Sequence, residues 1–266
     1  IPEDRVLWEA TRLNAAHGRQ LSKDEKRRLA RLFYKNNGCT LQEISEVLAV
    51  STGTLSGWLR NVIQQAREEQ KQKIIELYLD ARNTQQEIAD KVGLSQSRIS
   101  EIIGKFKTEK TDKPPIPESL KLYNVWYFPR RDPRYGLDFE GAIPGQIVEN
   151  VLYYYTEPFQ VVVDPMAGGG TTIDVCKAMY RRYLAYDLKP RRDDIRQHDI
   201  REGYPKETKN CDLVFLDPPY YNMVFSDLFK DIDEFYGFIE KLSEDSFSTV
   251  KNDGYVAFLM QDMTEK

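Results

Sequence analysis

The chain has 266 residues, of which 41% are hydrophobic and 30% are charged, and its formal net charge is −4 at pH 7. This much apolar material can bury two or three small cores, while the charged residues keep the chain soluble. No apolar run approaches the length of a membrane span and no signal peptide is visible, which argues against a membrane-spanning protein. We therefore expect a cytoplasmic protein.

Cysteines and histidines are few. Cys39, Cys176 and Cys211 lie far apart in the sequence and lack the spacing of metal ligands. We expect them to be reduced and mostly buried. The two histidines, His17 and His198, form no triad or cluster with them, so no metal site is expected.

The charge is unevenly distributed along the chain, and its N-terminal part is basic although the net charge is acidic. Residues 1–110 hold 19 Lys and Arg against 15 Asp and Glu, whereas residues 111–266 hold 19 against 27. The two parts therefore carry net charges of +4 and −8. Nucleic acid is expected to bind the basic part.

The first segment, Asn14 to Gly18 followed by Leu21 to Arg28, resembles the tail of ParB-like domains, where such a segment leads into a helix-turn-helix. The globular ParB-like core is missing, and the chain begins at Ile1. We therefore expect an internal part of a longer polypeptide, in which residues 1–62 form the ParB-like tail and a first helix-turn-helix.

An internal repeat with an offset of 44 residues comes next, because residues 40–56 align with residues 84–100. In each copy the pattern predicts a helix with apolar residues at helical spacing, a short turn, and a second helix capped by a serine. This is the pattern of a tandem helix-turn-helix, with the second unit at residues 63–106. In such units the second helix is the natural reader of a DNA major groove.

Polar positions on the second helix of each copy are candidates for DNA contact, since Arg and Gln suit bidentate contacts with bases. They are Thr54 and Arg60 in the first copy and Gln96, Ser97 and Arg98 in the second. The alternative is that one or both copies pack only against protein.

A charged, proline-rich stretch at residues 107–119 (KTEKTDKPPIPES) predicts an extended linker to a domain at residues 120–266. We expect this domain to fold without residues 1–110. It begins with an aromatic stretch: Tyr123, Trp126, Tyr127, Phe128 and Tyr135, interleaved with Arg130, Arg131 and Arg134. These side chains either contact DNA or flank a ligand pocket, or, as we prefer, cover the edge of a sheet.

Residues 161–172 (VVVDPMAGGGTT) predict a strand, a tight turn and the start of a helix. Gly168, Gly169 and Gly170 let the backbone approach a ligand closely, and the N-terminus of the helix offers N–H groups that suit a carboxylate. The GxGxxG fingerprint of dinucleotide binding is absent.

Four acids follow successive apolar runs: Asp164, Asp187, Asp199 and Asp217. Asp187 lies about twenty residues after the glycines, where doubly wound folds hold ribose hydroxyls. Each acid alone has the alternative of an ordinary loop residue. Four acids at successive strand ends together predict a ligand site.

Residues 211–222 (CDLVFLDPPYYN) predict a strand that ends in Asp217-Pro218-Pro219-Tyr220. The exocyclic amino group of a base is a poor nucleophile, because its lone pair is delocalised into the ring. A carboxylate and a fixed carbonyl localise that lone pair by accepting the two N–H hydrogens. Asp217 and the Pro218 carbonyl are our candidates for these two acceptors, and the two prolines hold them rigidly. Tyr220 offers an aromatic face for a base taken out of its stack. The alternative is a proline-rich turn after a core strand.

Together the two motifs resemble those of the DNA amino-methyltransferases that use S-adenosylmethionine. The resemblance implies an α/β methyltransferase-type doubly wound sheet, preceded here by the all-α tandem helix-turn-helix region. It implies that cofactor binding involves Asp164, Met166, Gly168, Gly170, Thr171, Asp187, Asp199 and Gln146, the last from the segment Ile143 to Asn150. Met166 stands where the family usually has phenylalanine, and the catalytic motif is Asp217, Pro218, Pro219 and Tyr220.

The implied reaction transfers a methyl group from S-adenosyl-L-methionine to adenine N6 of double-stranded DNA, with cytosine N4 as the second candidate. Carbon methylation is disfavoured because no Pro-Cys nucleophile is present. An RNA or protein amino-methyltransferase and a non-enzymatic DNA-binding regulator are the alternatives. The sequence decides neither whether the chain forms a homodimer nor whether it has a restriction or mobile-element partner. Because the family sheet normally adds a hairpin after a fifth strand at residues 255–260, we expect this domain to be truncated at its C-terminus.

Overall fold

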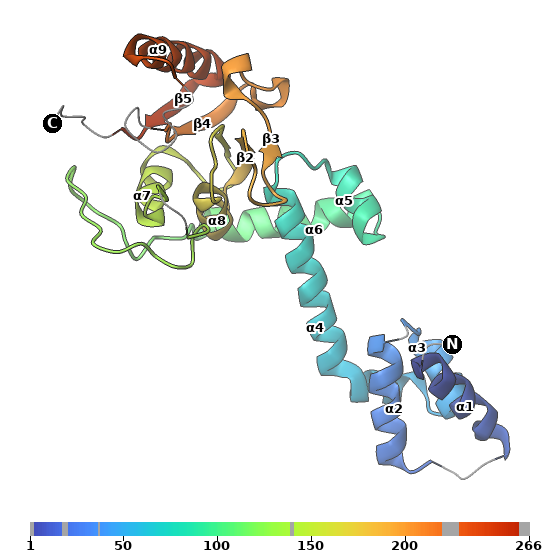
Figure 1. Ribbon diagram of the computed structural model, residues 1–266. Coiled ribbons are helices and arrows are strands. Elements are labelled where there is room, and N and C mark those ends of the chain that lie inside the picture. The colour runs from blue at the N-terminus through green and yellow to red at the C-terminus, as the bar shows by residue number, and fades with distance from the viewer. Residues whose placement is uncertain (1–2, 18–20, 37, 139–140, 220–228, 261–266) are drawn as a thin grey trace. The chain divides into compact units, whose positions relative to one another are not determined.

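The computed structural model describes residues 3–17, 21–36, 38–138, 141–219 and 229–260. The chain divides into two compact units, Ile1–Lys73 and Ile74–Lys266. Figure 1 shows their elements in chain order. No helix within the described ranges is long and apolar enough to cross a membrane.

The first unit contains α1 (Glu3–His17), α2 (Lys23–Asn36), α3 (Leu41–Leu48) and most of α4 (Thr52–Leu79). Its core is apolar, with Phe33, Ile44, Leu55 and Leu59 fully buried. The boundary expected after residue 62 falls inside α4, which continues without interruption into the second unit.

The two repeat copies have the same local structure. Thr40 begins α3 with a capping box, in which its hydroxyl accepts from the Glu43 N–H and the Glu43 carboxylate accepts from the Thr40 N–H. Thr84 and Glu87 make the same pair of bonds at the start of α5 (Gln85–Val92). A serine, Ser95, then caps α6 (Gln96–Asp112). Each copy thus contains the two helices that the sequence predicts, because each carries its own start signals.

The second unit is built on a five-stranded sheet in the order β3-β2-β1-β4-β5, in which every pairing is parallel. The strands are β1 (Val161–Asp164), β2 (Arg182–Asp187), β3 (Arg196–Gln197), β4 (Cys211–Leu216) and β5 (Val250–Phe258). The chain adds β2 and β3 on one side of β1 and then β4 and β5 on the other. The strand order therefore reverses between β1 and β4, which is where doubly wound sheets open a crevice for ligands.

Helices cover both faces of this sheet: α7 (Gly145–Tyr155), α8 (Thr171–Ala178) and α9 (Ile232–Thr249). Alternate strand residues enter different cores. Val162 and Tyr183 pack in the cluster that contains α7 and α8 residues, whereas Val163 and Leu184 pack with Leu242 of α9. Because both faces are covered, the strands are nearly continuous apolar runs. The predicted α/β fold is confirmed.

The helix pair α5–α6 is packed against the sheet. Ile75 and Leu79 of α4 and Phe106 of α6 belong to the same buried cluster as the residues under α7 and α8. The Ala81 N–H donates to the Tyr183 carbonyl at 3.0 Å, and the Arg182 guanidinium donates to the Tyr78 carbonyl at 3.1 Å. The pair therefore shares a core with the sheet, and the expectation that the sheet domain folds without residues 1–110 conflicts with this packing.

Helix α6 also extends into the segment predicted to be a linker. Residues 107–112 are helical, and the helix ends only at Lys113, directly before the prolines. The Lys110 ammonium lies 5.8 Å from the Phe106 ring centroid and 5.0 Å from that of Tyr180. These contacts and the absence of proline from residues 107–113 explain why the charged sequence stays helical.

The aromatic stretch at residues 120–139 divides into two parts. Tyr135 is buried and donates its hydroxyl hydrogen to Glu149 Oε1 at 2.6 Å, so it belongs to the sheet domain as preferred above. Tyr123 and Tyr127 are 77% and 76% exposed, so they do not cover the sheet. For these two residues the preferred interpretation is wrong, whereas Trp126 of the same segment packs against the core of the sheet domain.

Removing the Phe106 side chain tests the shared core. Phe106→Ala is expected to reduce the free energy of unfolding of the second unit by about 3–5 kcal/mol, since Phe106 is buried against Phe159 and Tyr180. Chemical denaturation of the full chain measures the change. Phe247→Ala is the control, because Phe247 is 79% exposed. Equal, small effects of both substitutions would show that α5–α6 is only loosely attached.

Candidate functional site

Four carboxylates meet at the carboxyl edge of the sheet. Asp164 ends β1, Asp187 ends β2, Asp217 follows the last residue of β4, and Asp199 comes two residues after β3. All four line one cavity of about 260 Å³. Parallel strands end at the same edge, so the topology brings together acids that are up to 53 positions apart in the sequence.

The glycine loop crosses the end of β1 and closes one side of the cavity. The Met166 N–H donates to Asp164 Oδ1 at 3.0 Å, and the Gly168 N–H donates to Asp187 Oδ2 at 2.8 Å. Gly168 and Gly170 have φ angles of 50° and 82°, a region that other residues rarely adopt. This turn brings Thr171 and Thr172, the first residues of α8, to the cavity wall.

Gly170 serves the loop rather than the cavity, because it does not belong to the lining. A Cβ atom at this position would lie 2.5 Å from Nη1 of Arg192. A side chain here would therefore displace the Arg192 guanidinium, in addition to adopting an unfavourable positive φ.

Asp187 and Asp199 have different surroundings. Asp187 accepts the N–H groups of Gly168 and Lys189, each at 2.8 Å, and both bonds use main-chain donors. Asp199 is paired with the Arg201 guanidinium, which donates to both of its oxygens and keeps the pKa of that carboxyl below its ordinary value. The sequence does not predict this Arg201 partner.

Asp164 and Asp217 both have raised pKa values. Burial raises the pKa of Asp164 to about 7, against the stabilising bonds from Thr172 and the Met166 N–H. Burial, and then the charge of Asp164, raise the pKa of Asp217 to about 7. Two carboxyl groups that are costly to ionise thus lie at the ends of adjacent strands.

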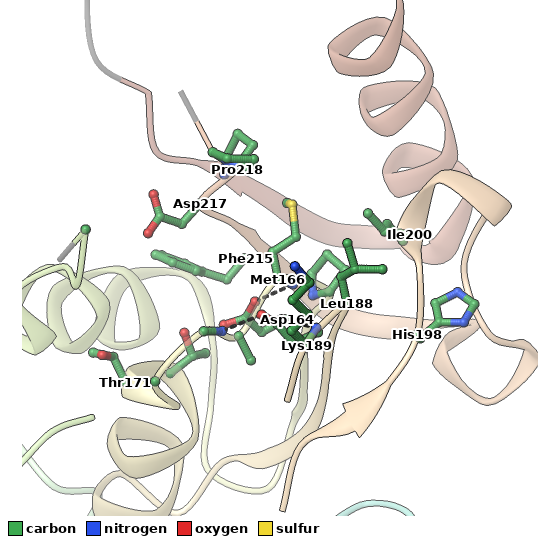
Figure 2. Close-up of a pocket in the computed structure, with 18 of the residues that line it drawn as sticks. Asp164, Met166, Thr171, Leu188, Lys189, His198, Ile200, Phe215, Asp217 and Pro218 are labelled. Atoms are coloured by element: carbon green, nitrogen blue, oxygen red, sulfur yellow. Dashed lines mark hydrogen bonds between the residues drawn. The ribbon is translucent and has the colours of Figure 1, made fainter. Parts of the chain in front are cut away.

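Figure 2 shows how the other side chains surround these acids. Asp217 and Pro218 lie on one side of the pocket, and Leu188, His198 and Ile200 lie on the other, with Met166 and Phe215 between them. Further members of the lining come from α9 and the residues before it, namely Phe238 and Phe229. The cavity therefore joins an apolar slot to a row of carboxylates.

Most of the predicted site residues are in this lining. Besides the four acids, they are Met166, Gly168, Thr171, Pro218 and Pro219. Gln146 is not among them, since its side chain accepts from the Asp132 N–H at 3.2 Å and donates to the Arg130 carbonyl at 2.9 Å. These two hydrogen bonds hold the segment before α7 against Gln146 in the first turn of that helix. Tyr220 lies outside the described residues.

Sequence reasoning missed the apolar part of the cavity. Leu188 and Ile200 directly follow the strand-end acids Asp187 and Asp199, and an apolar residue after such an acid was a usable signal. The sequence did not indicate that Phe229 and Phe238 line the cavity, because their position depends on how α9 packs.

The candidate DNA-binding residues are all exposed on their helices: Thr54 and Arg60 on α4, and Gln96, Ser97 and Arg98 on α6. Arg98 pairs with Glu101 one turn further along α6. Helix α6 packs on Phe159 and Tyr180, which precede β1 and β2, whereas the cavity lies at the opposite ends of these strands. The structure therefore does not bring the α6 residues to the cavity.

The sheet and its cavity are those of a methyltransferase-like α/β domain. A model of the DNA methylase family matches residues 22–197, more than half of the chain, so the chain belongs to this family. It is a DNA methyltransferase that acts on the N6 amino group of adenine or the N4 amino group of cytosine. No curated protein and no solved structure matches the chain.

The matched residues include the glycine loop and Asp187 but end before Asp199 and Asp217. The family therefore accounts directly for the part of the cavity that β1 and β2 form. The roles proposed for Asp217 and the other residues after β4 are therefore argued from their position in the cavity.

The raised pKa of Asp217 predicts how an uncharged replacement changes stability. The folded-state pKa of about 7 exceeds the ordinary 3.8, so ionisation of Asp217 destabilises the fold progressively as the pH rises from about 4 to about 7. Asp217→Asn removes this penalty. Its melting temperature is expected to exceed that of the wild type by an increment that grows over this interval and is constant above pH 7.

Thermal denaturation between pH 4 and pH 9 measures this increment. Asp253→Asn is the control, since Asp253 is an exposed acid on β5. An increment for Asp217→Asn that is independent of pH, or one that shrinks as the pH rises, would contradict the assigned burial.

Proposed function

We propose that the chain is an S-adenosylmethionine-dependent methyltransferase that modifies adenine N6 in double-stranded DNA. One observation carries the proposal: Asp217 and the glycine loop line the same cavity, at the point where the strand order reverses between β1 and β4. The carboxylate proposed to hold the amino group and the loop proposed to hold the cofactor are therefore within one small site.

The residues of the cavity fit the cofactor by their chemistry. The buried Asp164 carboxylate suits the ammonium of the methionine moiety, because a cation there relieves the cost of its ionisation. Asp187 uses its two oxygens for one N–H each and retains lone pairs for ribose hydroxyls. Leu188 and Ile200 provide apolar faces for the adenine ring.

Asp217 and Pro218 act on the target base. The amino group donates one hydrogen to the Asp217 carboxylate and the other to the Pro218 carbonyl, which returns the lone pair to nitrogen. Bound S-adenosylmethionine supplies a methyl group on a positively charged sulfur. The cofactor would give up its methyl group to the amino nitrogen and leave as the neutral thioether, and the proton that the amino nitrogen loses would pass to Asp217. Asp217 is charged when it accepts these hydrogens.

Adenine is preferred to cytosine because the motif begins with Asp followed by two prolines, the variant that leans towards adenine. The apolar lining from Phe229 and Phe238 beside Pro219 is compatible with a purine. Digestion of methylated DNA to nucleosides, followed by mass spectrometry, distinguishes N6-methyladenine from N4-methylcytosine. Detection of the cytosine product alone would contradict this part of the proposal.

We further propose that the helical front part holds the duplex, with α3–α4 and α5–α6 as helix-turn-helix units after a ParB-like tail. The first unit carries 13 Lys and Arg against 9 Asp and Glu, which suits a polyanion. Thr54 and Arg60 are exposed near the start of α4, the helix that would enter the major groove. In this proposal residues 63–106 would contact DNA and also share a core with the sheet of residues 120–266, whereas residues 1–62 would form the tail and the first helix-turn-helix.

Separate substitutions distinguish the two halves of the cavity. Asp217→Ala is expected to abolish methyl transfer to DNA and to leave the Kd for S-adenosylmethionine within about three-fold, because Asp217 is assigned to the base. Gly168→Val is expected to weaken cofactor binding first, since a side chain there enters the space of the methionine moiety. Calorimetry gives the Kd values, and transfer of a labelled methyl group gives the rates. Loss of cofactor binding in Asp217→Ala would make Asp217 a cofactor ligand.

The DNA-reading role is tested on Arg98, whose present partner is Glu101 on the same helix. If Arg98 reads a base, Arg98→Ala is expected to cost about 1–3 kcal/mol on the preferred sequence and much less on random DNA. Lys105→Ala is the matched control, since Lys105 pairs with the same glutamate. Equal losses on both DNAs would make Arg98 a phosphate contact. No loss on either would favour the packing role of the second copy.

A further inference from the structure

Arg192 lies next to the glycine loop but does not line the cavity. Its side chain is 18% exposed and forms ion pairs with two acids, Asp174 of α8 and Asp194. Nη1 and Nη2 each donate to one oxygen of Asp174 at 2.8 Å. Nε and Nη2 donate to the two oxygens of Asp194 at 2.9 and 2.8 Å. A planar guanidinium held on two edges by carboxylates has a fixed orientation.

This fixed group also touches the loop backbone. Nη1 of Arg192 lies 3.4 Å from the carbonyl oxygens of both Gly169 and Gly170. Three consecutive glycines have no side chains with which to anchor themselves, and they lose more conformational entropy on ordering than other residues. Because the Arg192 guanidinium contacts the carbonyls of Gly169 and Gly170 from the side away from the cavity, it restricts the conformation of the loop.

The same network extends in two further directions. Asp174 also accepts the Gly136 N–H at 2.8 Å, and the Leu137 N–H donates to the Gly169 carbonyl at 3.0 Å. On the other side, the Asp194 carbonyl accepts from Arg82, which lies between α4 and α5 and is itself paired with Asp80. The loop is thus connected to the α5–α6 pair through a continuous set of polar contacts.

We propose that Arg192 is a positioning residue for the reaction: it sets the affinity for the aminocarboxylate part of the cofactor by fixing the carbonyls of the glycine loop. This inference depends on the proposed function, in which the loop holds that part of S-adenosylmethionine. Arg192 touches neither cofactor nor base in this scheme. It acts through Gly169 and Gly170.

Arg192→Lys tests the proposal, because lysine keeps the charge and loses the fork that bonds two acids and two carbonyls at once. The Kd for S-adenosylmethionine is expected to rise roughly ten- to a hundred-fold, the loss typical of a reacting group displaced by about an ångström. The Kd for 5′-methylthioadenosine, which lacks the aminocarboxylate, is expected to change less than about two-fold. In kinetics, KM for the cofactor is expected to rise more than kcat falls.

Arg196→Lys is the matched control. Arg196 is four residues away, pairs with Glu207 at an exposed site and does not line the cavity. Its cofactor affinity is expected to equal that of the wild type. Asp174→Asn provides a second variant that removes one partner of Arg192, and it is expected to change the affinities in the same direction.

The outcomes are distinct. Unchanged S-adenosylmethionine affinity in both Arg192→Lys and Asp174→Asn overturns the positioning role. An equal loss of affinity for both probes, with a lowered melting temperature, also overturns it, because that pattern belongs to general destabilisation. Failure of the wild-type chain to bind S-adenosylmethionine at all overturns the proposed function instead.

Discussion

The parallel pairing of β1 with β4 is the constraint on which the site depends. Val162 and Val163 of β1 lie in register with Leu213 and Val214 of β4, so the residues that follow both strands emerge side by side. Because β2 and β3 lie on the other side of β1, the strand order reverses at this point, which is where doubly wound sheets leave a crevice. The loop after β1 and the Asp-Pro-Pro segment after β4 therefore share one cavity, and neither alone encloses it.

That arrangement places one buried carboxyl group, that of Asp164, next to the half-buried Asp217. Asp164 is buried, and its charge raises the pKa of Asp217 beyond what burial alone does. A fold selected only for stability has no reason to place a buried carboxyl group next to a half-buried one. A site that receives a cationic cofactor and a base with an amino group has such a reason, since both neutralise or bond these oxygens. We infer that the cost of ionising Asp164 and Asp217 is tied to the proposed methyl transfer.

The two repeat copies show that one local pattern can serve two tertiary settings. Thr40 and Thr84 form the same capping box, and the helices that follow have corresponding lengths of eight residues. The first copy encloses its own core, whereas the second shares a core with the sheet through Ile75, Leu79 and Phe106. The part of the chain that supports the cavity therefore begins in α4 and includes a helix pair that resembles a DNA-binding unit in sequence.

What the sequence determined by itself is whatever short-range chemistry decides. The two helices of each repeat copy, the tight turn after β1 and the acids after the strands follow from neighbouring residues, and the structure has them where the patterns predict. The capping boxes at Thr40 and Thr84 are equally local, although the repeat alone did not specify them. Tertiary structure alone decided the side-chain partners. Gln146 faces the segment before α7, because Asp132 and Arg130 offer it hydrogen bonds that no local pattern reveals.

The same reason explains Phe106 and Arg192. Phe106 belongs to the sheet core because Phe159 and Tyr180, more than 50 residues later, complete its surroundings. Arg192 reaches the glycine loop because β2 and β1 are paired, which returns the chain after β2 to the start of α8. Contacts of this kind depend on which elements meet, and that is settled by the packing of the whole unit rather than by any segment of the sequence.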